Sequence, residues 1–155
     1  MSDLPARFQA DQVGSLPDSL SITWTHAEAG IVEGRLLIEP RHLAPNGYLH
    51  AATAIALADT ACGYGCRTKL PKGASDFTTV ELKANFLGTA RQGAISCRAV
   101  VAHAGRSTQV WDAEVRSEES GKAIALFRCT QIILYGPKND RLVPPVATAN
   151  KPIGA

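Results

Sequence analysis

The sequence predicts an α+β domain in which a curved, mostly antiparallel sheet wraps around one long central helix. Two stretches of alternating apolar and polar residues come first, one Ala-rich stretch follows, and four more alternating stretches complete the order. Only the segment from His50 to about Cys66 has the composition of a long buried helix. Strands grouped around a single helix favour a segregated α+β arrangement.

The first two predicted strands form a hairpin. Apolar and polar residues alternate from Leu20 to His26, and a second strand-like run extends from Ile31 to Glu39. Gly30 interrupts the pattern between them and marks a turn. Residues 1–19, which precede the hairpin, carry weak signals, and we expect an N-terminal arm or short helix there.

The predicted central helix begins near His50, after a loop that contains Pro45 and the dipeptide Asn46-Gly47. The helix is rich in Ala, has few charges and carries apolar residues on most faces, which is typical of a helix that is buried nearly all round. A single sheet covers only one side of such a helix. We therefore expect the remaining face, or the sheet edge, to meet a second subunit.

Four more strands complete the predicted sheet. They are expected at residues 77–87, 94–103, 107–117 and 123–135. The domain therefore covers residues 20–135. Residues 136–155 are rich in proline and polar residues, and we expect them to form a loose C-terminal tail.

Length and composition fit one globular domain with a full core. The chain has 155 residues, of which 45% are hydrophobic and 19% charged, and a net charge of +2. The basic residues are scattered, so nucleic acid is not an expected partner. No apolar run is long enough to cross a bilayer, no signal peptide is recognisable, and the four cysteines form no Cys-x-x-Cys pair, so we expect a cytoplasmic protein.

One carboxylate stands out. Asp59 is the only acidic residue between His50 and Gly65. Desolvating an unpaired carboxylate is costly, so Asp59 needs hydrogen-bond partners, a raised pKa or a chemical role. The free N–H groups at the helix start near His50 suit an anion. The structural alternative is that Asp59 caps a loop or pairs with a basic residue.

The segment from Asn46 to Ala61, Asn-Gly-Tyr-Leu-His-Ala-Ala-Thr-Ala-Ile-Ala-Leu-Ala-Asp-Thr-Ala, resembles the signature of PaaI-like hotdog thioesterases. In that family a Gly-x-Leu sequence precedes His-Gly-Gly, and an acidic residue follows nine positions after the histidine. The matching positions are Gly47, Leu49, His50 and Asp59. The resemblance covers roughly residues 20–135. It implies the hotdog fold, in which a sheet wraps a central helix and subunits pair edge to edge.

The resemblance implies hydrolysis of an acyl- or aryl-CoA thioester to the free acid and CoA. Asp59 would be the nucleophile or the general base, and either role needs an ionised carboxylate at the carbonyl. The backbone N–H of Ala51 would donate to the thioester oxygen. His50 would orient the loop or contact the thioester. Thr79 would support the attacking water, reaching in from the neighbouring subunit.

Two positions depart from the family pattern. The paired glycines are Ala51-Ala52 here, and the Asn or Gln that lies six residues before the histidine is Ala44. Asn46, beside Gly47, is the candidate substitute for substrate binding. Other candidates are basic or hydroxyl side chains that could meet the CoA phosphates: Arg106, Ser107, Lys83 and Arg91.

The resemblance also implies a homodimer or homotetramer with active sites at the subunit interface. No cofactor is expected, because CoA is part of the substrate, and the histidines lack the spacing of a metal site. Two other functions stay open: a non-catalytic protein that binds or senses acyl-CoA, and a hotdog dehydratase or hydratase. The aromatic candidates for contact with the acyl group are Tyr48, Tyr64, Phe77 and Trp111.

Overall fold

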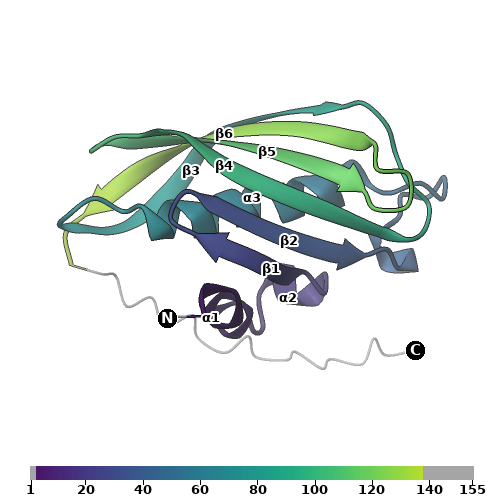
Figure 1. Cartoon of the computed structure of the whole chain (residues 1–155), viewed down its shortest axis with the longest axis horizontal. Coiled ribbons are helices and arrows are strands. Elements are labelled where there is room, and N and C mark those ends of the chain that lie inside the picture. Colours follow the sequence, from purple (N-terminus) through teal and green to yellow (C-terminus); the bar gives the residue numbers. More distant parts are fainter. Residues whose placement is uncertain (1–2, 138–155) are drawn as a thin grey trace, which may run out of the picture.

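The computed structural model describes residues 3–137. A curved sheet lies against one long helix, and two short helices precede the sheet (Figure 1). The elements in chain order are α1 (Leu4–Asp11), α2 (Leu16–Ser19), β1 (Thr23–Glu28), β2 (Ile31–Leu37), the 3-10 turn η1 (Pro40–His42), α3 (Ala51–Thr68), β3 (Ala74–Phe86), β4 (Ala94–Ala104), β5 (Thr108–Ser117) and β6 (Ala123–Tyr135). The predicted tail lies, from residue 138 onward, outside the described residues.

The sheet has six strands in the order β1-β2-β4-β5-β6-β3, and every neighbouring pair is antiparallel. After α3 the chain crosses to the far edge, where β3 pairs with β6 over most of its length. The two edges are therefore β1 and β3. The predicted α+β fold, with an antiparallel sheet around one central helix, is confirmed.

The prediction was wrong about where the first strand begins. Strand β1 starts at Thr23 rather than Leu20. The N–H groups of Ser21 and Ile22 bond instead to carbonyls of the preceding helical turn, at Asp18 and Pro17. These bonds hold the backbone away from the sheet until Thr23.

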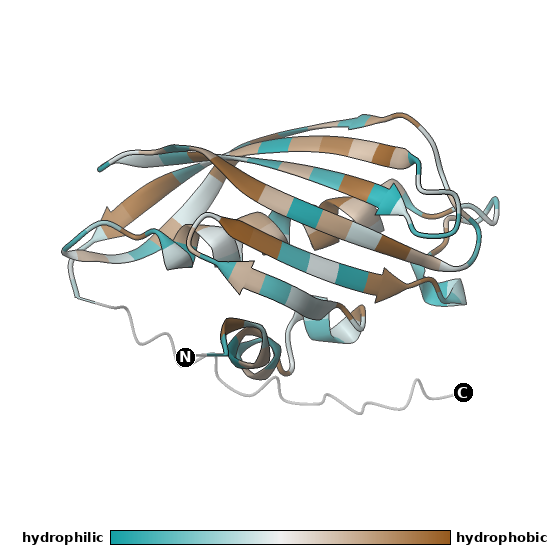
Figure 2. Ribbon diagram, viewed as in Figure 1, coloured by the Kyte–Doolittle hydropathy of each residue, from teal (hydrophilic) through white to brown (hydrophobic). Residues whose placement is uncertain are grey.

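The core lies between α3 and the inner face of the sheet. Hydrophobic and polar residues alternate along the strands, as Figure 2 shows, so one face of each strand packs inward. The alanines and glycines of α3 allow close contact with the sheet. A Cβ added at Gly65 would lie 2.5 Å from Cζ3 of the buried Trp111, so that position has no room for a larger residue.

Helix α1 packs against β1 and also contacts the C-terminal half of α3 at Tyr64 and Arg67. The Phe8 ring stacks on Tyr64 with centroids 4.3 Å apart, and the Tyr64 hydroxyl donates to the Phe8 carbonyl. The buried Gln12 side chain donates to the Ile22 carbonyl at 2.8 Å and accepts from Trp24 Nε1 at 2.7 Å. These contacts attach the N-terminal helix to both α3 and β1.

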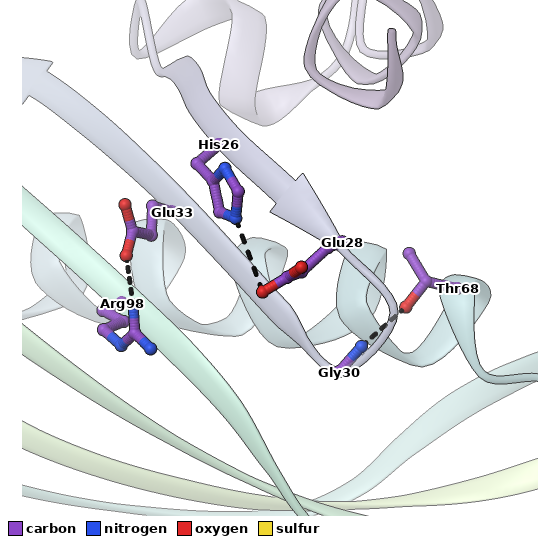
Figure 3. A network of polar contacts seen from close by, with 6 residues as sticks. All are labelled: His26, Glu28, Gly30, Glu33, Thr68 and Arg98. Carbon is purple, nitrogen blue, oxygen red and sulfur yellow. Dashed lines mark hydrogen bonds and ion pairs between the residues drawn. The ribbon is translucent and has the colours of Figure 1, made fainter. Parts of the chain in front are cut away.

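The C-terminal end of α3 is tied to the first hairpin. The Gly30 N–H donates to the Thr68 hydroxyl at 3.4 Å (Figure 3). Glu33 of β2 pairs with Arg98 of the neighbouring strand β4 (Figure 3). None of the helices within residues 3–137 combines the length and the hydropathy needed to span a membrane.

Candidate active site

The N-terminus of α3 is held by two histidines. His50 is the N-cap residue, and its Nδ1 accepts from the Ala52 N–H at 3.0 Å. In its neutral form this imidazole therefore carries its proton on Nε2. The carbonyl of the fully buried His42 accepts from the His50 N–H at 2.9 Å and from the Thr53 hydroxyl at 3.0 Å. The position of the first helical turn is thus fixed from two sides.

The backbone N–H of Ala51 is free. Ala51 is the first helical residue and is exposed, and its N–H donates no hydrogen bond among the described residues. An unused N–H at the positive end of a helix favours an oxygen that gains negative charge. The geometry therefore allows the role that the family resemblance implies for Ala51.

The loop before His50 forms a tight turn. The Asn46 Oδ1 accepts from the Tyr48 N–H at 3.2 Å, and Gly47 adopts a left-handed φ of +80°, which favours glycine. The Arg91 guanidinium lies 4.0 Å from the centroid of the Tyr48 ring. Asn46 is therefore engaged in the loop through its oxygen, and its amide NH₂ group is left as the donor for a ligand.

Asp59 lies further along α3, half-buried beside β3. Its Oδ1 accepts from the Thr79 hydroxyl of the same chain at 3.4 Å. Desolvation raises the pKa of the Asp59 carboxyl, and the hydrogen bond from Thr79 opposes that rise. The resemblance implies that this hydroxyl comes from a neighbouring subunit, whereas β3 here runs along its own α3 and brings Thr79 to its own Asp59.

Thr79→Val removes the hydroxyl that lowers the pKa of Asp59. We expect the acidic limb of the pH profile to move to higher pH for any reaction that uses the Asp59 carboxylate, because the carboxyl without this hydrogen bond keeps its proton to higher pH. The loss on the plateau should be about fivefold, as expected for one hydrogen bond. Thr78→Val, on the exposed side of the same strand, is the control. A Thr79→Val profile that coincides with the control profile would contradict the role of Thr79.

A groove of about 400 Å³ opens beside Asp59, between α3 and β3. It is lined by Asp59, Thr60, Gly63, Tyr64, Arg67, Asp76, Phe77 and Thr79. The α3 members share one helix face, since they are spaced by three or four residues or are adjacent. Neither Arg67 nor Asp76 was predicted from the sequence as a site residue. Its predicted helix stopped at Cys66, although the position eight residues after Asp59 would have pointed to Arg67.

A larger hollow of about 990 Å³ lies on the other side of the sheet. Lys83, a predicted candidate for the CoA phosphates, lines this hollow, but Asp59, His50 and Ala51 do not. Several of its charged side chains form ion pairs with one another, such as Arg35 with Glu118 and Arg128 with Asp112. Because Asp59 lines the smaller groove, we place the candidate active site there and not in the larger hollow.

Arg106 and Ser107 are not brought to the groove or to the N-terminus of α3. They form the turn between β4 and β5, where their carbonyls accept from the Tyr135 hydroxyl and the Ile133 N–H. The nearby Gln109 side chain bonds to the Lys69 carbonyl, which marks this as the C-terminal end of α3. In a single chain, then, these two residues lie at the opposite end of α3 from His50.

Among residues 3–137, no three His, Cys, Asp or Glu side chains converge in a way that could hold a metal ion.

The fold and the site together define a class. A long helix packed against an antiparallel sheet, with an exposed N–H at its start and a half-buried carboxylate two turns later, agrees with the arrangement that the resemblance to hotdog thioesterases implies. Residues 46–124 match the model of the thioesterase superfamily, and the chain belongs to that superfamily.

Known proteins of similar sequence and structure support the assignment to this superfamily. The 1,4-dihydroxy-2-naphthoyl-CoA hydrolase of Listeria monocytogenes is 29% identical over 115 residues, which span 74% of this chain and 92% of that protein. A mutant of thioesterase PA1618 from Pseudomonas aeruginosa superimposes with a TM-score of 0.80 at 25% identity, covering 86% of this chain and 95% of that one.

The PaaI protein of Escherichia coli shares the fold, with a TM-score of 0.74 at 22% identity over 85% of this chain and 92% of that one. The resemblance to PaaI-like hotdog thioesterases is thereby confirmed, and so is the hotdog fold. At the level of the family, the activity is hydrolysis of a thioester.

Proposed function

We propose that this chain hydrolyses an acyl- or aryl-CoA thioester to the free acid and CoA. The observation that carries the proposal is the half-buried Asp59 carboxyl, which lines a groove and whose pKa burial raises. An ionised carboxylate has about four acceptor sites, whereas Asp59 accepts only from Thr79 among the described residues. A carboxylate so placed is suited to act on a substrate.

Two routes use this carboxylate. As a general base, Asp59 takes a proton from water while the water oxygen adds to the thioester carbonyl. As a nucleophile, Asp59 adds directly and forms an anhydride, which water then cleaves. In both routes the carbonyl oxygen gains negative charge, which the Ala51 N–H stabilises, and the C–S bond breaks to release the CoA thiolate. His50 Nε2–H is a second donor at the same helix end.

The Ala51 N–H and the Asp59 carboxylate of the same chain cannot act together on one carbonyl. Ala51 and Asp59 are eight residues apart on α3, which separates them by about 12 Å along the helix axis. A general base has to lie within hydrogen-bond reach, about 3 Å, of the atom whose proton it removes, or be connected to that atom through one bridging water. We therefore infer that each active site combines Asp59 of one subunit with the α3 N-terminus of another.

The edge strand β3 supports pairing with a second copy. It is a 13-residue strand at the end of the sheet, so one side of its backbone has no partner strand within residues 3–137. Three of its large apolar side chains are exposed: Val80 by 51%, Leu82 by 43% and Phe86 by 46%. A long apolar edge is typical of a strand that pairs with another chain. We propose a homodimer, or a tetramer built from it, through this edge.

The proposal predicts thiol release from CoA thioesters. We expect the purified protein to release CoA from at least one class in a panel of short-chain, medium-chain, long-chain and aryl thioesters, measured with a thiol-reactive chromophore. Saturable binding without thiol release across the panel would contradict hydrolysis and favour an acyl-CoA binding protein. Hydration of an enoyl thioester without thiol release would favour a hydratase.

A further inference from the structure

The imidazole of His42 is buried, and the proposed hydrolysis does not use it. The residue has no exposed surface, and its Nδ1 accepts from the Glu39 N–H at 3.0 Å. A ring nitrogen that accepts carries no proton, so the imidazole is neutral with its proton on Nε2. Nε2 is itself buried and has no hydrogen-bond partner among residues 3–137. The surroundings of His42 therefore hold its ring in one tautomer.

His42 connects the turn η1 to the start of α3. Its N–H donates to the Glu39 carbonyl at 2.9 Å, so the backbone and the side chain of His42 both close the turn. Its carbonyl accepts from the Thr53 hydroxyl and from the N–H of His50, the titratable residue that α3 brings to it. Because His50 directly precedes Ala51, the position of the free Ala51 N–H depends on this turn.

The groups around the imidazole oppose a second proton on the ring. Desolvation by burial is the largest effect and lowers the pKa of His42, and the charge on Arg41 lowers it further. The Glu39 carboxylate and the backbone carbonyls of Leu20 and Leu37 act in the other direction without reversing the shift. Glu39 is in turn paired with Arg41, with Oε2 3.1 Å from Nε.

A proton on Nδ1 is incompatible with the closed turn. Nδ1–H would face the Glu39 N–H, and two donors cannot bond to each other. A buried imidazolium would also have two unpaired donors in place of one, at a further cost in free energy. Opening of η1 relieves both conflicts, and it displaces the carbonyl that holds the His50 N–H and the Thr53 hydroxyl.

We propose that His42 is a positioning residue whose neutral imidazole locks η1, and through it the Ala51 N–H, and whose protonation releases both. For its effect on activity the inference rests on the proposed hydrolysis, to which it adds a proton-dependent lock on the oxyanion donor. Since the pKa of His42 in the folded chain lies below its ordinary value of 6.5, the lock is closed at neutral pH. The unfolded chain takes up this proton first, so the stability that the neutral ring confers is lost as the pH falls from about 6.5 through the lowered pKa.

The first test needs no substitution. Proton–nitrogen correlation NMR reports the tautomer of the ring and the environment of each backbone amide while the whole chain is titrated with acid. We expect a neutral ring protonated on Nε2 at pH 7, and amide shifts of Glu39, His50 and Ala51 that change with the same midpoint as the His42 ring. A ring that titrates without these amides would refute the lock, and so would a ring that stays neutral until the chain unfolds.

Two substitutions at His42 separate the lock from the packing of the ring. His42→Asn places an amide oxygen about where Nδ1 lies, so it keeps an acceptor for the Glu39 N–H without a titratable ring. His42→Leu fills similar space and leaves that N–H unpaired. We expect His42→Leu to lower kcat at pH 7 by about tenfold to a hundredfold with little change in KM, the effect of misplacing a transition-state donor by about 1 Å. His42→Asn should recover most of this loss, and equal kcat values for the two variants would contradict the inference.

The acid limb of the pH profile tests the release by protonation. If Asp59 and His42 must both be unprotonated, log kcat/KM of the wild type should fall with a slope that approaches about two at low pH. Only Asp59 remains in His42→Asn, and the slope should be about one. His26→Asn removes an exposed histidine of β1 and should retain the wild-type slope. Equal slopes in the wild type and His42→Asn would show that protonation of His42 releases nothing.

Failure of the lock and failure of the proposed function give different results. Thiol release with a wild-type slope of about one leaves hydrolysis in place and overturns the lock. If no CoA thioester releases thiol, the proposed hydrolysis fails, and the NMR titration then decides the inference by itself. Joint titration of the His42 ring and the Ala51 amide supports the lock, and independent titration overturns it.

Discussion

Asp59→Asn is expected to lower kcat/KM for thioester hydrolysis by about a hundredfold to ten-thousandfold, the range associated with a general base in the transition state. Asparagine has nearly the same shape, but it can neither accept a proton at neutral pH nor attack a carbonyl. The Thr79 hydroxyl can still donate to the amide oxygen, so the local contact persists. Thiol release over the substrate panel measures the effect.

The same substitution should not destabilise the fold at neutral pH. Because burial raises the pKa of Asp59, the folded chain holds this proton more tightly than the unfolded chain does. Ionised Asp59 therefore lowers the free energy of unfolding above its folded pKa, and this cost disappears below the ordinary value of 3.8. Asp59→Asn removes the cost, and thermal unfolding at pH 7 should show an unchanged or higher Tm.

Asp112→Asn provides a matched control with the opposite sign. Asp112 lies on the outer face, where its hydrogen bond with Arg128 lowers the pKa of the carboxyl. Replacing it should leave thiol release unchanged and should lower Tm slightly at neutral pH. If Asp59→Asn instead retains wild-type thiol release, or loses it together with several degrees of Tm, the carboxylate is structural and not catalytic.

Local sequence patterns accounted for much of the fold. Alternation located β4, β5 and β6 within one residue, because each of these strands has one face against the core and one outside. The helix start was also found, since His50 behaves as an N-cap after a loop with Pro45 and Gly47. The predicted helix ended at Cys66, two residues before the observed end of α3 at Thr68. Neither Arg67 nor Thr68 is a helix breaker, so the sequence carried no signal for the true end.

Long-range contacts could not be derived in this way. The stack of Phe8 on Tyr64 joins residues far apart in the chain, and no local pattern encodes it. The pairing of β3 with β6 at the sheet edge is equally non-local. The groove forms where β3 lies beside α3, which is why Arg67 and Asp76 were identified only from the structure. The family resemblance pointed to His50 and Asp59 as candidate site residues. Because one straight helix joins them, their side chains lie too far apart to reach the same carbonyl within one chain.

Ala51→Pro is expected to lower kcat/KM by about a hundredfold to a thousandfold, the cost of losing one oxyanion donor. Proline lacks the N–H but is well tolerated as the first helical residue. The preceding His50 has φ −68° and ψ 134°, which suits a residue before proline, and the Ala51 N–H donates no bond that the substitution would break among the described residues. Ala51→Gly keeps the N–H and should keep the activity.

Mixing the two inactive proteins tests where the active site lies. In a dimer of one Asp59→Asn subunit and one Ala51→Pro subunit, one site has both defects and the other combines an intact Asp59 with an intact Ala51 N–H. Random reassociation at equal concentrations should therefore restore about a quarter of wild-type activity in a twofold-symmetric dimer. A site built within one chain would be defective in every subunit of the mixture, so an inactive mixture of reassociated, folded subunits would refute the shared site. Recovery of thiol release would show that the 12 Å or so between Ala51 and Asp59 is bridged by a second copy of the chain.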